Sequence, residues 1–222
     1  MERVTLSVII PAYNERDTIA EAIRRVQEAN LGDGVSLEIL VVDDCSTDGT
    51  REVLRGIPGI RVLQHERNQG KGAAIRTALA HASGDVVVIQ DADLEYDPAD
   101  LRKMLEPIRQ GKTAVVYGSR FLKSRPQMRR ANYVANRILA WAATLLFFHR
   151  ITDEATCYKM FRADVLRAMN LKARRFEFCP EVTAKALRAG YRIVEVPISY
   201  RARTVAEGKK ISWKDGFSAL WT

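Results

Sequence analysis

Two aspartates separated by a single residue, Asp91 and Asp93, are the clearest candidates for chemistry in this sequence of 222 residues. They follow an apolar run at residues 86–89, which predicts a buried strand that ends just before them. Carboxylate oxygens are hard ligands that suit Mg²⁺ or Mn²⁺, and Glu95 is a candidate third ligand. A cation held there would neutralise negative charge on a departing diphosphate. The alternative interpretation is an acidic turn that follows a strand.

Two further polar segments stand at comparable positions. Asp43 and Asp44 follow an apolar run at residues 37–42, and a carboxylate there can accept hydrogen bonds from a base or a ribose, although turn formation alone is the alternative. Residues 68–72 (NQGKG) precede a predicted helix, so their backbone N–H groups, beside Lys71, could face an anion. This segment matches neither a Walker A loop nor a dinucleotide-binding fingerprint, which argues against both classes of enzyme.

The elements that would position these residues alternate between strands and helices. Apolar runs predict strands at residues 4–11, 37–42, 60–63, 86–90 and 114–117, and helical spacing predicts helices at residues 19–29, 50–54, 72–82 and 98–108. This order is typical of a doubly wound parallel sheet, in which ligands bind beyond the carboxyl ends of the strands. The polar segments around Tyr13, Asp43, Asp91 and Arg120 all follow predicted strands, so we expect them at one edge of the sheet.

The second half of the chain is patterned differently. We expect a helix at residues 131–148, a strand at 158–161, a helix at 181–189, a strand at 191–200 and an amphipathic stretch at 214–221. No internal repeat or flexible linker interrupts the sequence. The prediction is therefore an α/β fold in which a mostly parallel sheet is flanked by helices, in a single domain over residues 1–222 with halves at 1–118 and 119–222.

Composition narrows the class of protein. With 47% hydrophobic and 28% charged residues, the chain is typical of globular proteins rather than disordered ones. Cys45, Cys157 and Cys179 form no close pair in the sequence, which argues against a disulfide framework or a zinc knuckle and favours a reducing compartment. No apolar run approaches the roughly 20 residues that span a bilayer, and the N-terminus lacks a signal-peptide layout. These features predict a cytoplasmic location.

The net charge of +8 is distributed unevenly. Residues 119–152 contain seven Lys or Arg residues and no Asp or Glu, which favours a polyanionic partner: a phosphate-bearing substrate, an anionic membrane surface or a nucleic acid. No nucleic-acid-binding motif is recognisable, so a basic nucleic-acid-binding module is the least favoured hypothesis. Beside the basic residues, Trp141, Leu145, Phe147 and Phe148 could lie on a membrane surface or receive a prenyl chain; a core or dimer contact is the alternative.

Together these motifs resemble a known family. Residues 8–15 (VIIPAYNE), 41–50 (VVDDCSTDGT), 68–72 (NQGKG) and 91–93 (DAD) occur in the order seen in inverting glycosyltransferases of the GT-A fold. Residues 118–121 (GSRF), Thr152-Asp153, Glu181 and residues 196–200 (VPISY) are similar to the branch that contains dolichyl-phosphate mannose synthases and other polyprenyl-phosphate glycosyltransferases. The resemblance covers residues 6–215. It departs at Cys179, where many relatives carry an acid, and at Glu154-Ala155.

The resemblance implies a nucleotide-sugar donor bound by residues 1–118 and an acceptor bound by residues 119–222. The implied donor-binding residues are Pro11, Tyr13, Glu15, Asp43, Asp44, Lys71 and Ala92. Asp91 and Asp93 resemble the diphosphate–metal pair, and Glu95 stands where mannose synthases usually have a glutamine ligand. Arg203 and Lys209 resemble a basic pair on a loop that closes over the donor.

The acceptor side has a separate physical argument. A phosphate monoester has a second pKa of about 6 and is therefore largely dianionic at neutral pH. To attack a sugar it needs cations that bind it rather than a general base. Arg120, Arg129 and Arg130 resemble the arginines that hold such a phosphate, and Arg120 is also expected to be catalytic. We therefore expect sugar transfer from a GDP-mannose or UDP-glucose type of donor to a polyprenyl phosphate, with Mg²⁺ or Mn²⁺, at the cytoplasmic face of a membrane. A saccharide hydroxyl acceptor, with Asp153 or Glu154 as base, is the alternative, and the sequence assigns no oligomeric state.

Overall fold

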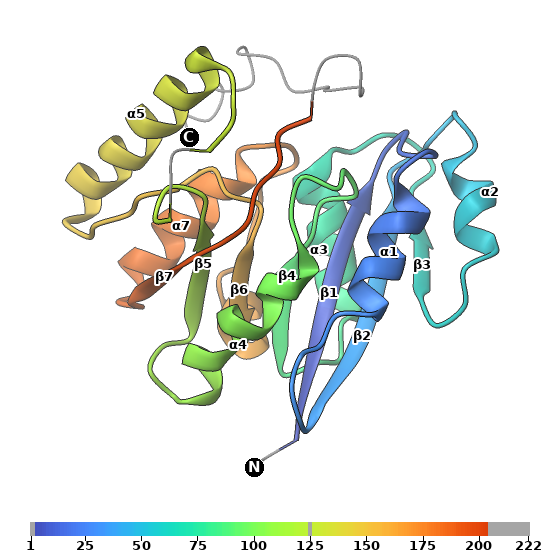
Figure 1. Ribbon diagram of the computed structural model, residues 1–222, viewed down its shortest axis with the longest axis horizontal. Coiled ribbons are helices and arrows are strands. Elements are labelled where there is room, and N and C mark those ends of the chain that lie inside the picture. Colours follow the sequence, from blue (N-terminus) through green and yellow to red (C-terminus); the bar gives the residue numbers. More distant parts are fainter. Residues whose placement is uncertain (1–2, 124–125, 204–222) are drawn as a thin grey trace.

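The apolar runs form the central strands of one sheet in the computed structural model, which describes residues 3–123 and 126–203 (Figure 1). Its seven strands are β1 (Val4–Ala12), β2 (Val35–Asp43), β3 (Arg61–Gln64), β4 (Val86–Ile89), β5 (Val115–Ser119), β6 (Lys159–Arg162) and β7 (Ile193–Pro197). They lie in the order β3-β2-β1-β4-β6-β5-β7. The described chain is a single α/β domain, and the prediction of a mostly parallel sheet is confirmed.

One strand runs against the others. β6 is antiparallel to both β4 and β5, with Met160 opposite Val88 on one side and Val116 on the other. The remaining pairs are parallel, so β1, β2, β4 and β5 all end at the same edge. Because β6 and β7 come from the second half of the chain, both halves share one sheet. The polar groups that follow β4 and β5 are thereby held at the edge where β1 and β2 end.

Helices cover both faces of the sheet. They are α1 (Ile19–Gln27), α2 (Thr50–Arg55), α3 (Lys71–His81), α4 (Leu101–Arg109), α5 (Arg130–Phe147), α6 (Ala163–Ala168) and α7 (Phe178–Arg188), with a 3₁₀ turn at Pro98–Asp100. In Figure 1, α1 and α4 lie in front of the sheet and α3 lies behind it. The central strands are buried on both faces, as their nearly continuous apolar sequences predict.

The structure corrects three predicted elements. α7 begins at Phe178 rather than at residue 181, because Pro180 lies in the first turn, where a missing N–H breaks no helical hydrogen bond. The last strand ends at Pro197 instead of extending to residue 200. The short helix α6 was not predicted, since its six residues are too few for a clear helical period. The amphipathic stretch at 214–221 lies outside the described residues.

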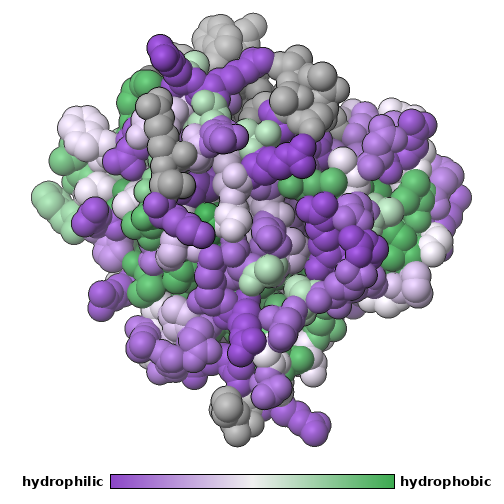
Figure 2. Space-filling model, viewed as in Figure 1, coloured by the Kyte–Doolittle hydropathy of each residue, from purple (hydrophilic) through white to green (hydrophobic). Residues whose placement is uncertain are grey.

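α5 is attached at the side of the domain and packs mainly on α7. Only Ala140 and Ala143 of this helix are buried. Large apolar side chains are exposed on it and just after it, at Val134, Ile138, Trp141, Leu145, Leu146 and Phe148. Figure 2 shows hydrophobic side chains at the edge of the molecule where Figure 1 places α5. No helix within the described residues is long and apolar enough to cross a membrane.

The close approach of Gly84 to β1 makes a stability prediction. A Cβ at Gly84 would lie 2.4 Å from Ser7 Oγ and 2.7 Å from the Thr5 carbonyl oxygen, so Gly84→Ala forces β1 to shift. We expect the variant to lose about 1–3 kcal/mol of unfolding free energy in urea. Gly56→Ala is the matched control, because its Cβ would meet only the Val53 carbonyl oxygen at 3.6 Å. Equal stability of the two variants would contradict the prediction.

Candidate functional site

A cleft of about 480 Å³ opens where β1, β2 and β4 end. Most of the predicted site residues line it: Pro11, Tyr13, Glu15, Asp44, Lys71, Asp91, Ala92, Asp93, Glu95 and Arg203. Arg175 and Phe176, from the loop before α7, also line it and were not predicted. Nothing in their local sequence distinguishes them from a surface loop. The tertiary fold brings this loop against the start of α3, where the Ala73 N–H donates to the Arg174 carbonyl oxygen.

Lys71 neutralises the first aspartate of the predicted pair. Its Nζ lies 2.6 Å from Asp91 Oδ1, and both side chains are about one-fifth exposed. Burial disfavours the charge on Lys71, but the Asp91 carboxylate outweighs this effect and raises the pKa of the ammonium group. The lysine at the start of α3 therefore stays positively charged inside the cleft.

The carboxyl group of Asp93 has a strongly raised pKa. Burial, together with the negative charges of Asp91 and Glu95, raises the pKa of Asp93 to about 7. Its Oδ1 accepts one hydrogen bond, from the backbone N–H of Glu95. A carboxyl group that titrates near neutrality among other carboxylates binds a divalent cation favourably, because the cation removes the repulsion that raises the pKa.

Residues just after β7 cross this side of the cleft. Arg203 donates through Nη2 to Glu15 Oε2 at 2.9 Å and through Nε to the Asp93 carbonyl oxygen at 2.5 Å. Its backbone N–H donates to Glu95 Oε1, and the Tyr200 hydroxyl donates to Glu95 Oε2. Arg203 thus links the end of β1 to the acidic segment after β4. Lys209, its predicted companion, lies outside the described residues.

The two aspartates at the end of β2, Asp43 and Asp44, lie in different surroundings. Asp44 lines the cleft, and its oxygens accept hydrogen bonds from the backbone N–H groups of Gln69 and Gly70, so it shapes the loop that leads into α3. Asp43 is fully buried and does not line the cleft. It accepts a hydrogen bond from Arg51 at 2.9 Å.

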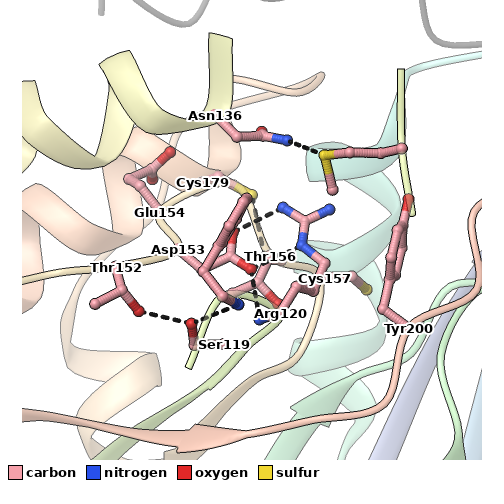
Figure 3. Close-up of polar contacts among 12 residues, drawn as sticks. Ser119, Arg120, Asn136, Thr152, Asp153, Glu154, Thr156, Cys157, Cys179 and Tyr200 are labelled. Atoms are coloured by element: carbon pink, nitrogen blue, oxygen red, sulfur yellow. Dashed lines mark hydrogen bonds and ion pairs between the residues drawn. The ribbon is translucent and has the colours of Figure 1, made fainter. Parts of the chain in front are cut away.

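Arg120 is not among the residues that line the cleft. Figure 3 shows its polar surroundings. Its Nε and Nη2 both donate to the Asp153 carboxylate at 2.7 Å, and its backbone N–H donates to the same group. Both side chains are almost completely buried. The Glu195 carboxylate in turn accepts hydrogen bonds from the backbone N–H groups of Thr152 and Asp153, which fixes the segment that carries the pair. Asp153 therefore acts here as the partner of Arg120.

The remaining acceptor-side residues are spread around this pair. Arg129 and Arg130 are exposed at the start of α5 and do not line the cleft. Glu154 is buried, and burial raises its pKa. It lines a separate hollow of about 560 Å³ between α5 and α7. A larger hollow, of about 810 Å³, lies at the opposite edge of the sheet, where β1 and β4 begin, and contains none of the predicted site residues.

A divalent cation fits the cleft through Asp91 and Asp93. No three Asp, Glu, His or Cys side chains in residues 3–123 and 126–203 form a ready-made metal cluster. Glu95, the predicted third ligand, has both carboxylate oxygens engaged by Tyr200 and Arg203. The two aspartates nevertheless supply hard oxygens beside an open space, and Mg²⁺ characteristically takes its other ligands from water and substrate phosphates. The residues present fit a cation that is shared with a bound diphosphate.

A mixed sheet with such a cleft at its carboxyl edge defines a GT-A type of domain. It superimposes on glucosyl-3-phosphoglycerate synthase from Mycobacterium tuberculosis, solved with Mn²⁺ and UDP, with a TM-score of 0.73 and 24% identity over 98% of this chain and 77% of that one. It also matches the mannosyltransferase PcManGT from Pyrobaculum calidifontis, solved with GDP-Man and Mn²⁺, with a TM-score of 0.63 and 26% identity over 89% of this chain and 56% of that one.

The chain belongs to glycosyl transferase family 2, whose profile matches residues 7–169. It is 33% identical to the undecaprenyl-phosphate mannosyltransferase of Micrococcus luteus, over 90% of this chain and 85% of the relative. It is 30% identical to the dolichol-phosphate mannosyltransferase of Pyrococcus furiosus, over 92% of this chain and 58% of the relative. The chain spans about three fifths of the length of several such relatives, between 58% and 63%.

The raised pKa of Asp93 predicts a pH-dependent stability. Between the ordinary aspartate pKa of about 4 and the raised value of about 7, folded Asp93 holds a proton that the unfolded chain releases, so the metal-free stability falls as pH rises through this range. Asp93→Asn removes the ionisation. In urea unfolding with a chelator, we expect the variant to be about 1–4 kcal/mol more stable than wild type at pH 8, with a smaller difference at pH 5. Asp33→Asn, at an exposed position, is the control, and a variant less stable than wild type at pH 8 would refute the charge repulsion.

Proposed function

We propose that this protein is an inverting glycosyltransferase that transfers a sugar from a nucleotide diphosphate sugar to a polyprenyl phosphate. One observation carries the proposal: a single cleft at the carboxyl edge of the sheet brings the carboxylates Asp91 and Asp93 together with the cations Lys71 and Arg203. Carboxylates that hold a cation, with basic side chains beside them, are what a diphosphate leaving group requires. The Mn²⁺-bound nucleotide complexes of the structural neighbours support the same use of the fold.

The donor would occupy the cleft from β1 to β4. Pro11, Tyr13 and Glu15 would contact the base and ribose, while Asp44 and the buried Asp43 hold the loops that shape this pocket. Asp91 and Asp93 would hold Mg²⁺ or Mn²⁺, which when bound would stabilise the charge on the diphosphate. Lys71 and Arg203 would bind the diphosphate oxygens directly, giving up their present carboxylate partners Asp91 and Glu15.

The acceptor would approach from the side of Arg120. A phosphate oxygen would attack the anomeric carbon as the bond to the leaving diphosphate breaks, through an oxocarbenium-like transition state. Arg129 and Arg130 are exposed for phosphate binding, and Arg120 would add its remaining Nη1. The relatives include an undecaprenyl-phosphate mannosyltransferase and a dolichol-phosphate mannosyltransferase, which supports this acceptor class.

A saccharide hydroxyl acceptor is less well supported. Such an acceptor needs a general base that reaches the reacting oxygen. Asp153 is held by Arg120 through two hydrogen bonds, and Glu154 lies in the hollow between α5 and α7 rather than in the cleft. Neither carboxylate is placed as a base in this arrangement, whereas a phosphate acceptor needs none.

The exposed apolar side chains of α5 support contact with a membrane surface. They lie on α5 or just after it, and Arg129 and Arg130 lie at the start of this helix, so a cationic end adjoins an apolar face. A lipid-linked acceptor has its phosphate at the headgroup level, where both kinds of residue would be useful. We propose peripheral contact of this kind and no nucleic-acid partner.

A transfer assay tests the proposal. The protein is mixed with Mn²⁺ or Mg²⁺, undecaprenyl phosphate, and labelled GDP-mannose or UDP-glucose in separate reactions, with and without a chelator. Chelator-sensitive label in the organic phase is expected with one donor. Release of nucleotide diphosphate without organic label would contradict the lipid acceptor but retain the glycosyltransferase. Failure with a widened panel of donors, in both label transfer and nucleotide release, would contradict the glycosyltransferase itself.

Asp93→Asn should nearly abolish transfer while the fold persists. The amide keeps the size of the side chain but removes the charge that would hold the cation, so we expect a loss of at least about 100-fold in kcat. Circular dichroism and thermal melting check the fold, and Asp33→Asn controls for the loss of one charge. Wild-type turnover in a folded Asp93→Asn enzyme would show that the metal assignment is wrong.

Arg129→Ala/Arg130→Ala should raise KM for the acceptor more than KM for the donor. Both side chains are exposed and lie outside the donor cleft, so we expect about a tenfold or greater effect on the acceptor and a donor KM within about twofold of wild type. Arg102→Ala/Lys112→Ala removes the same charge from exposed positions in and after α4 and is the matched control. Equal effects on both substrates would contradict the acceptor assignment.

A further inference from the structure

One side chain outside the cleft lining, Tyr200, contacts both sides of the proposed site. Its ring lies beneath the Arg120 guanidinium, with 5.1 Å between the guanidinium carbon and the ring centroid. Its hydroxyl donates to Glu95 Oε2 at 2.7 Å. Figure 3 shows Arg120 between Asp153 and Tyr200. One phenol side chain therefore contacts Arg120 on the acceptor side through its ring and Glu95 on the donor side through its hydroxyl.

On the acceptor side, the Tyr200 ring and the Asp153 carboxylate together hold the Arg120 guanidinium in place. Asp153 holds the guanidinium edge through two hydrogen bonds, and Tyr200 and Phe121 offer aromatic rings within 6 Å of its centre. The arginine is almost completely buried, and a desolvated cation gains more from an aromatic ring than an exposed one does. The direction in which the rest of the guanidinium points therefore depends on the Tyr200 ring.

On the donor side, the hydroxyl helps to hold the segment that crosses the cleft. Glu95 accepts from the Tyr200 hydroxyl and from the Arg203 N–H, while its own carbonyl oxygen accepts from the Arg201 N–H. Arg203 reaches from this segment to Glu15 across the cleft. A shift of Tyr200 would move Glu95 and with it the position of Arg203.

The surroundings of Tyr200 make it a stiff connection. Its ring packs edge-on against Tyr96, with 5.5 Å between centroids, and the two residues form an isolated β-bridge. The Tyr96 hydroxyl accepts from the Cys157 N–H, and the N–H of Ser199 donates to the buried Asp100. Because the ring is fixed on these sides, it holds the groups at both of its ends in place.

We propose that Tyr200 is a positioning residue that couples the donor and acceptor sides, keeping Arg120 aimed at the acceptor phosphate while Glu95 and Arg203 are placed over the donor diphosphate. This inference rests on the proposed function. Tyr200 does not line the cleft and touches neither substrate in this arrangement; it acts through Arg120 at one end and Glu95 at the other. Its two contacts are chemically distinct, so they can be removed one at a time.

Two substitutions separate the contacts. Tyr200→Phe keeps the ring beneath Arg120 and removes only the hydrogen bond to Glu95, so we expect the Kd of Mn²⁺ with UDP or GDP, measured by calorimetry, to rise about 5- to 10-fold while the KM for undecaprenyl phosphate stays within about twofold. Tyr200→Leu also removes the ring, and the acceptor KM should then rise about fivefold or more as well. Tyr191→Phe, a half-buried tyrosine outside the site, is the matched control and should change neither value.

A double variant tests whether the hydroxyl acts through Glu95. If it does, Tyr200→Phe in the Glu95→Gln background should add less than about twofold to the loss caused by Glu95→Gln alone. Fully additive losses would overturn the coupling. So would a Tyr200→Phe enzyme whose nucleotide Kd equals that of wild type, or whose donor and acceptor values rise equally, as general loosening would cause.

The wild-type protein separates this inference from the proposed function. If the wild type transfers sugar and Tyr200→Phe has the wild-type nucleotide Kd and acceptor KM, only the coupling is contradicted. Wild type that binds neither nucleotide with Mn²⁺ would remove the proposed function and the coupling together. Wild type that binds nucleotide but does not use the lipid phosphate would remove the acceptor half of both.

Discussion

Negative charge gathered at one edge of the sheet is the constraint on which the rest of this structure depends. Parallel strands deliver carboxylates to their carboxyl ends, and like charges held close together in a partly buried cleft repel one another. Each carboxylate is compensated differently: Lys71 pairs with Asp91, Arg203 pairs with Glu15, and backbone N–H groups hold Asp44. Asp93 has no cationic side chain paired with its carboxylate among the described residues, and burial with the charges of Asp91 and Glu95 raises its pKa to about 7.

The antiparallel strand β6 allows a second set of charges to be built beside the first. It inserts between β4 and β5, so Arg120 after β5 comes to lie next to the acidic segment after β4 without entering the cleft. Asp153 neutralises Arg120 in the interior, where an unpaired charge would be strongly destabilising. Tyr200 contacts both groups of charges, Arg120 through its ring and Glu95 through its hydroxyl. Under the proposed function, these two sets of charges would serve the leaving group and the anionic nucleophile separately.

The local pattern predicted most of the framework. Continuous β-branched runs identified the central strands because strands buried on both faces need apolar side chains at every position. The position of the cleft followed from the rule that parallel strands end at one edge, and ten of the predicted residues line it. Arg175 and Phe176 could not be predicted, because their place in the cleft depends on a loop that docks against α3 from about a hundred residues away in the sequence.

The sequence by itself determined the class of fold, the family and the identity of the acidic and basic residues, since these depend on hydrophobic periodicity and on short motifs. Only the tertiary structure decided how those residues are paired. Glu95 was predicted as a metal ligand, yet its oxygens are held by Tyr200 and Arg203, more than 100 positions along the chain. Arg120 was predicted to hold a phosphate, and the fold pairs it with Asp153, 33 positions along the chain. Charge partners are chosen by distance and burial, and no periodicity encodes which distant residues will meet.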